Sequence, residues 1–199
     1  MKLIKKRWLG LSLASTLIAL GAFSTPALAA DYSGNCAFIP NHVTGNAVVN
    51  DTTCVINTGT TLTVDGTLTI NTSGSIDIQS NIVSDGKVKI LTSASVKTKK
   101  VTSTNSDIII QSTQNRVETE NLTAGNSVQL DAGLNGAENS SWDILVKAPI
   151  IANKLQTNPS PDVHGNILLR AAGNISTKTV RSDGGLGAQS AKSGGIQIE

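Results

Sequence analysis

The chain has 199 residues, of which 39% are hydrophobic but only 3% aromatic, and its formal net charge is +2. So few aromatic side chains argue against a layered globular core, whereas abundant Thr, Ser, Asn and Gly with Val, Ile and Leu suit a narrow core of stacked β-branched residues. The charge balance gives no reason to expect nucleic acid as a partner.

The N-terminus has the organisation of a secretory signal peptide. Four positive charges come first, at Lys2, Lys5, Lys6 and Arg7. An apolar run from Trp8 to Phe23 follows, and it ends in "STPALAA" with small residues at Ala27 and Ala29. An uncleaved membrane anchor is the alternative, but the run is short for a bilayer span. We therefore expect residues 1–29 to be removed and the remaining chain, with net charge −2 and no integral membrane span, to be periplasmic, at the cell surface or extracellular.

Cys36 and Cys54 are the only cysteines of the chain. In an exported protein, two cysteines this close in sequence predict one disulfide. A metal site is the weaker interpretation, because neither has a nearby His or a further Cys. We expect the bridge to tie an N-terminal cap segment, residues 30–46, onto the first turn of a repeat that occupies residues 47–199.

That repeat has a period of about twenty residues, which three columns of apolar residues reveal. The first column contains Leu68/Ile70, Val88/Ile90, Ile108/Ile110 and Val128/Leu130, and Val48 is predicted to extend it backwards. The second contains Ile56, Ile76, Val96 and Val117, and the third Leu62, Ile82, Val101 and Leu122. Within each short run, apolar and polar residues alternate as in strands, and turn residues such as Asp65-Gly66 and Asp85-Gly86 recur in phase. The pattern predicts an all-β parallel β-helix, a single-stranded solenoid with three short strands per coil.

The C-terminal part continues the pattern. Residues 167–183 align without gaps on 88–104, which places Ile167, Leu169, Ile175 and Val180 in the apolar columns. Between Leu130 and Ile167 we predict a shortened coil beginning at Ile144, and a single coil with a long insertion is the alternative. The final "GGIQIE" starts a new coil, so the repeat is expected to be incomplete at the C-terminus, with continuation in a longer chain or end-to-end self-association as the two explanations.

Charged residues fall into outward columns of alternating sign. The register places Asp77, Lys97 and Glu118 in one column, Lys99 and Glu120 in another, and Lys87 beside Asp107. Polysaccharide lyases and hydrolases need several carboxylates that converge on one patch, which this alternation does not provide. Asp residues before Gly are typical of turns, and a dense calcium-binding Gly/Asp repeat is absent. Threonines do not continue from coil to coil, as an ice-binding surface would need. We expect no catalytic residue, cofactor or metal.

Three irregular stretches, residues 131–142, 158–165 and 183–195, interrupt the coils. Loops on a rigid scaffold are common binding sites. Trp142 and His164 are the distinctive side chains there, and they are our candidate binding residues.

Two longer segments of the C-terminal part resemble a known family. "GNILLRAAGNISTKTVRSDGGLGAQSAKSGGIQIE" and "SSWDILVKAPIIANKLQ" are similar to coils of filamentous-haemagglutinin-type bacterial surface proteins. The resemblance implies a secreted or surface-exposed right-handed solenoid used in adhesion, with a host surface or polysaccharide as partner. A structural or adhesive protein without catalytic activity is therefore the expected function. The alternative is a carbohydrate-active enzyme or carbohydrate-binding module of pectin-lyase-like fold.

Overall fold

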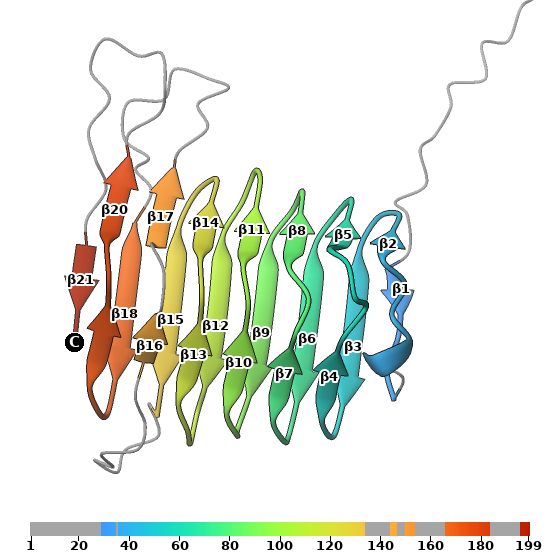
Figure 1. Ribbon diagram of the computed structural model, residues 1–199, viewed down its shortest axis with the longest axis horizontal. Helices are drawn as coiled ribbons and strands as arrows, with labels where there is room; N and C mark the ends of the chain where they lie inside the picture. Colours follow the sequence, from blue (N-terminus) through green and yellow to red (C-terminus); the bar gives the residue numbers. More distant parts are fainter. Residues whose placement is uncertain (1–28, 35, 134–143, 147–149, 154–165, 184–195) are drawn as a thin grey trace, which may run out of the picture.

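The computed structural model describes residues 29–34, 36–133, 144–146, 150–153, 166–183 and 196–199 (Figure 1). They form a parallel β-solenoid with coils of about twenty residues and one strand of each of three sheets per coil. Strands that are neighbours in a sheet come from successive coils, and every pair is parallel. The all-β solenoid predicted from the apolar columns is thus confirmed.

The three sheets share the long axis of the solenoid. The eight-stranded sheet contains, in spatial order, β1 (Ala30–Asp31), β3 (Ala47–Asp51), β6 (Leu68–Thr72), β9 (Val88–Thr92), β12 (Ile108–Ser112), β15 (Val128–Ala132), β18 (Ile167–Ala171) and β21 (Ile196–Ile198). The six-stranded sheet contains β4 (Cys54–Ile56), β7 (Ile76–Ile78), β10 (Val96–Thr98), β13 (Val117–Thr119), β16 (Ile144–Val146) and β19 (Ile175–Thr177). The seven-stranded sheet contains β2 (His42–Val43), β5 (Leu62–Val64), β8 (Ile82–Ser84), β11 (Val101–Ser103), β14 (Leu122–Ala124), β17 (Ile150–Asn153) and β20 (Val180–Asp183).

The core is a stack of apolar side chains inside the coil. Leu68 pairs with Val88 and Ile70 with Ile90, and all four are fully buried. The third column is also as predicted, because Leu62, Ile82, Val101 and Leu122 follow one another in register and are fully buried. Burial of each such side chain stabilises the fold by about 1.5–3 kcal/mol.

The register of the first coil differs from the prediction at two positions. Ala47 and Val49, rather than Val48, occupy the inner column, since they pair with Leu68 and Ile70. Similarly, Cys54 pairs with Ile76, so Ile56 lies beside Ile78, two residues further along the strand than predicted. The one-residue slip at Val48 turns that side chain to the other face, whereas the two-residue slip at Ile56 keeps it in the core.

The segment between Leu130 and Ile167 is one coil, not a shortened coil beginning at Ile144. Val128 pairs directly with Ile167, and β16 and β17 of the same coil extend the other two sheets. Residues 134–143 and 154–165 are inserted after β15 and β17, respectively. Gly133, whose φ of 75° favours glycine, ends the regular path of β15. The structure therefore agrees with the alternative interpretation, a single coil with a long insertion, except that the extra residues follow two strands instead of one.

Buried serine hydroxyls bond to the backbone at the corners of the coil. Ser103 Oγ donates a hydrogen bond to the Gly86 carbonyl oxygen of the preceding coil at 2.8 Å, and Ser112 Oγ donates to Ala94 at 2.6 Å. These hydroxyls are buried, so they satisfy corner carbonyls that strands cannot reach. At Gly86 the stacked corners approach so closely that a Cβ atom would lie 2.9 Å from the backbone of Gly66.

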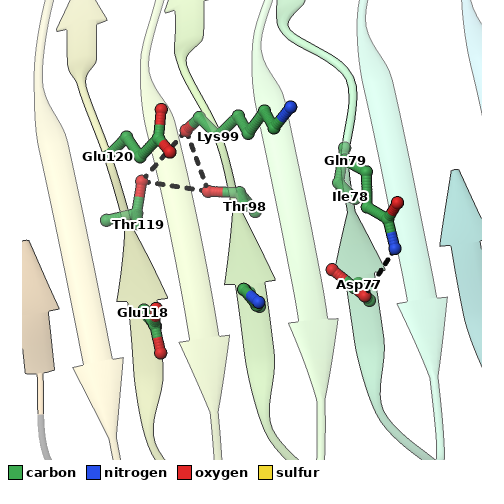
Figure 2. A pocket seen from close by; sticks show the side chains of 9 residues that line it. Asp77, Ile78, Gln79, Thr98, Lys99, Glu118, Thr119 and Glu120 are labelled. Atoms are coloured by element: carbon green, nitrogen blue, oxygen red, sulfur yellow. Dashed lines mark hydrogen bonds between the residues drawn. The ribbon is translucent and has the colours of Figure 1, made fainter. Parts of the chain in front are cut away.

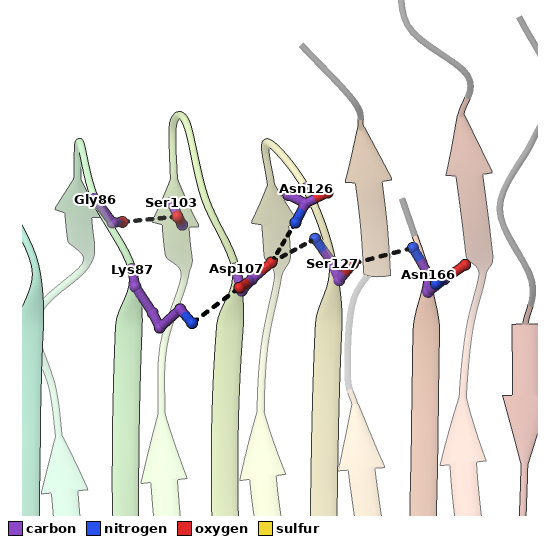
Figure 3. Close-up of polar contacts among 7 residues, drawn as sticks. All are labelled: Gly86, Lys87, Ser103, Asp107, Asn126, Ser127 and Asn166. Carbon is purple, nitrogen blue, oxygen red and sulfur yellow. Dashed lines mark hydrogen bonds and ion pairs between the residues drawn. The ribbon is translucent and has the colours of Figure 1, made fainter. Parts of the chain in front are cut away.

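A polar ladder marks the entry to the strands of the eight-stranded sheet (Figure 3). Lys87 Nζ lies 3.1 Å from Asp107 Oδ2, as the predicted register requires. Asp107 Oδ1 in turn accepts from Asn126 Nδ2 at 2.6 Å and from the Ser127 amide at 3.3 Å. Ser127 Oγ accepts from the Asn166 amide at 3.2 Å. The ladder therefore links successive coils along the axis.

The N-terminal cap segment forms a first, incomplete coil of the solenoid. β1 and β2 extend two of the sheets, and the 3-10 helix η1 (Cys36–Phe38) lies between them in sequence and against β4. The predicted disulfide is present: Cys36 of η1 is bonded to Cys54 of β4. This turn therefore covers one end of the core (Figure 1).

Candidate functional site

The most distinctive surface feature is a groove of about 330 Å³ on the outer face of the six-stranded sheet (Figure 2). It crosses β7, β10 and β13 and the residues that follow each strand. Its lining consists of Asp77, Ile78, Gln79, Lys97, Thr98, Lys99, Glu118, Thr119 and Glu120.

Strand alternation places the charged side chains in this groove. Ile76 and Ile78 point into the core, so Asp77 between them points outward. Lys97 pairs with Asp77 on one side and with Glu118 on the other, which confirms the predicted outward column. Adjacent strands lie about 4.8 Å apart, so the column repeats at that spacing along the axis.

Lys97 shares a register with Asp77 and Glu118 without a contact ion pair to either. Among the residues that the structure describes, no ion pair within 4.0 Å joins Lys97 to Asp77 or to Glu118. Instead, Arg116 Nη2 lies 3.8 Å from Glu118 Oε2. The strands, rather than ion pairs between its own charges, therefore hold this column in register.

Amide side chains link the groove to the preceding coil. Asn57 Nδ2 donates to Gln79 Oε1 at 3.1 Å, and Gln79 Nε2 donates to Asp77 Oδ2 at 3.0 Å. The other carboxylate oxygen, Asp77 Oδ1, is buried and has no hydrogen-bond partner. A second hollow of about 240 Å³ adjoins the groove, since Gln79 and Lys99 line both. The amide chain thus fixes one oxygen of Asp77 and leaves the other unsatisfied.

Two exposed apolar side chains stand beyond the N-terminal end of the groove. Val55 of β4 pairs with Asp77 and is 50% exposed. Phe38 of η1, next to β4, is 80% exposed, an unusual state for one of only two phenylalanines in the chain. We had not singled out Phe38 from the sequence. The available signal was its position two residues after Cys36. The disulfide holds Cys36 in the core, and the short segment that follows it lies at the surface.

The sequence analysis also missed an ion pair to a buried carboxylate. Arg170 Nε lies 2.8 Å from Asp131 Oδ1, and Arg170 Nη2 lies 3.1 Å from Asp131 Oδ2. Asp131 is fully buried although it points away from the core, and Gln129 donates to it as well. The hydrogen bonds to Asp131 raise the pKa of the Arg170 guanidinium above its ordinary value. Such a bidentate pair orients β15 and β18 relative to one another.

The predicted binding residues Trp142 and His164 lie outside the described residues. In the part of the chain that is described, no group of three or more His, Cys, Asp and Glu residues is placed to hold a metal ion. No helix among the described residues is long and apolar enough to cross a membrane.

Comparisons of the chain with protein-family models, with curated proteins and with solved structures gave no match.

Proposed function

We propose that this protein is an exported β-solenoid with a structural or adhesive role that presents a binding surface outside the cytoplasm and has no catalytic activity of its own. The observation that carries the proposal is the continuous core. Its inner columns contain buried side chains from Ala47 to Leu169. Such a stiff scaffold suits the display of a surface more than the closing of an active site.

Export is supported by the N-terminal coil. The Cys36–Cys54 disulfide joins η1 to β4, and structural disulfides persist mainly in oxidising compartments outside the cytoplasm. The signal-peptide pattern of residues 1–29 and the resemblance to filamentous-haemagglutinin-type coils favour the same location. A bacterial surface or periplasmic protein is the interpretation that combines them.

The groove favours a second candidate, a carbohydrate-binding module. Carboxylates on Asp77, Glu118 and Glu120, the carboxamide of Gln79 and two lysines line it, and polar groups of these kinds orient ligand hydroxyls in binding sites. Asp77 and Glu118 are two strands apart, about 10 Å, with Lys97 between them.

The test is the location and the effect of the native protein in the cells that produce it. We expect the protein outside the cytoplasm, accessible to added protease in intact cells or released by periplasmic extraction, and with the mass of a chain cut after Ala29. Cells that lack the protein should adhere less to a host surface or polysaccharide, or lose integrity of their envelope. A cytoplasmic protein that retains residues 1–29 would contradict the proposal, as would turnover of a polysaccharide by the purified protein.

A further inference from the structure

We propose that a hollow at three successive corners of the coil binds a phosphate or sulfate group. We define the corner hollow as the space of about 240 Å³ beside the groove, whose lining includes Thr60, Thr61, Asn81 and Lys99. The inference rests on the proposed function and adds a class of ligand to it.

Unequal loops between the six-stranded and the seven-stranded sheet produce this hollow. The connection comprises residues 57–61 after β4, residues 79–81 after β7 and residues 99–100 after β10. Because these successive loops shorten, they do not stack evenly, and the hollow lies between them. Its volume is below the roughly 300–1,000 Å³ of pockets that enclose a drug-sized ligand. The corner hollow therefore suits one chemical group and not a whole ligand.

Four side chains of the corner hollow have hydrogen-bond donors that the protein does not use. They are the hydroxyls of Thr60 and Thr61, the carboxamide of Asn81 and the ammonium group of Lys99. Within the described part of the chain, none of these groups makes a hydrogen bond or an ion pair. Unlike Asp77 Oδ1, none of them is closed to solvent. A ligand can therefore reach all four donors.

Lys99 gives the corner hollow a positive charge that its lining does not neutralise. The other described residues of the lining are Asn57, Gly59, Gln79 and Ser80, and none carries a charge. Glu120 lies on the next coil, but no ion pair within 4.0 Å joins it to Lys99 among the described residues. Figure 2 shows the Lys99 side chain extending toward Gln79 and away from Glu120. The ammonium group is thus directed to the hollow, where an anion would be favoured.

The loop that carries Thr60 and Thr61 is held in place by the protein itself. The Thr58 amide donates to Ser80 Oγ at 2.9 Å, and Thr58 Oγ1 donates to the Thr60 carbonyl oxygen at 2.8 Å. Ser80 is buried, so the first contact anchors the loop to the next coil. Donors that are fixed in this way lose little conformational freedom when a ligand binds.

The types of donor favour a tetrahedral oxyanion over a planar carboxylate. Arg binds a carboxylate through two parallel N–H bonds, and the described lining of the hollow contains no Arg. The ammonium group of Lys99 is instead a point charge with three donors that can rotate. The oxygens of phosphate and sulfate point in four directions, so they can accept from the donors of all three loops at once.

The experiment follows backbone amide chemical shifts of the isotope-labelled exported protein during titration at constant ionic strength. The probes are inorganic sulfate, inorganic phosphate, glucose 6-sulfate and glucose 6-phosphate, with glucose and glucuronate as the neutral and the planar anionic control. We expect saturable shifts in residues 57–61, 79–81 and 99–100, with dissociation constants of about 1–10 mM for the tetrahedral anions. Tighter binding of the sugar esters would identify a group on a larger ligand, and equal binding would identify the free ion.

Two variants with the same change of charge test the role of Lys99. Lys99→Gln should weaken binding by at least about tenfold, because it removes the charge of the hollow. Lys97→Gln is the matched control, since Lys97 lies on β10 two residues earlier and does not line the hollow, and it should weaken binding less than about twofold. Circular dichroism confirms that each variant is folded.

Three results would overturn the inference: no saturable shifts with any of the four tetrahedral anions, binding of glucose or glucuronate as tight as that of the esters, or equal losses in Lys99→Gln and Lys97→Gln. These outcomes are separate from failure of the proposed function. An exported, adhesive protein that binds no oxyanion would refute only the ligand class, whereas a cytoplasmic protein would refute the proposed function itself.

Discussion

The central coils and the C-terminal coil have the same kinds of side chain in the inner columns but bury them differently. Ile76 and Val96 are 1% exposed, whereas Ile175, which continues their column, is only partly buried. Val180 is partly buried in the column where Leu62 and Ile82 are fully buried. Ile196 and Ile198 of β21 are 47% and 57% exposed. Burial in this fold therefore depends on a neighbouring coil on each side, and not on the residue type alone.

The N-terminal end shows how the fold covers its core. Ala47 and Cys54, in the first strands of their coil, are fully buried because β1 and η1 lie over them. At β19 and β20 no further strand follows within the described residues of their sheets. The comparison predicts that the same substitution has a large effect in a central coil and a small one at β19.

The largest effect is expected for a charge placed in a central inner column. Ile110→Asp puts a carboxylate into a fully buried position of β12 between β9 and β15, and it should abolish the folded β signal in circular dichroism. Ile175→Asp in β19 is the matched substitution, and it should leave that signal in place because its side chain can reach water. If both variants stay folded, the inner-column assignment is wrong.

This comparison also shows what the sequence could reveal. The periodic columns predicted the three sheets because stacked coils must align side chains of like polarity. The period failed at Val48 and Ile56, where the coil is longer: Ala47 pairs with Leu68, twenty-one residues further on. It failed between Val128 and Ile167 because an insertion at a corner does not alter the sheets and leaves no periodic signal.

The groove was predicted in part. Its column of Asp77, Lys97 and Glu118 follows from register alone. The contacts within it depend on side-chain rotamers, so the link from Gln79 to Asp77 could not be predicted. Phe38 was missed because it lies in a 3-10 helix, which does not follow the twenty-residue repeat from which the other positions were predicted.

The second prediction tests the ion pair that joins the C-terminal coil to the central ones. Arg170→Met should lower the free energy of unfolding by about 1–3 kcal/mol, because it leaves the fully buried Asp131 carboxylate with Gln129 but without the guanidinium. Lys178→Met, which removes an exposed charge from the same coil, is the control and should have little effect. Urea denaturation measures both. Equal effects would show that Asp131 finds another partner at no cost.

The third prediction concerns the covered N-terminal end. Replacing Cys36 and Cys54 together by alanine should lower the free energy of unfolding by about 3 kcal/mol, since the disulfide closes a loop of eighteen residues. The two proteins should differ only while the wild-type disulfide is formed. In reductant, the free energy of unfolding of the wild-type protein should approach that of the variant. Exchange of amide hydrogens should rise first in β1, η1 and β4. Uniform exchange along all coils would mean that the disulfide stabilises the whole solenoid and not its end.

The smallest effect separates the two kinds of charge column in the central coils. Lys87 and Asp107 form a contact ion pair at 3.1 Å with side chains that are 40% and 22% exposed, so a double-mutant cycle with alanine should give a coupling of about 0.5 kcal/mol. Lys97 and Glu118 share a register but make no contact ion pair with each other, and the same cycle should give a coupling close to zero. A larger coupling for Lys97 and Glu118 would mean that their charges close on one another across the groove in solution.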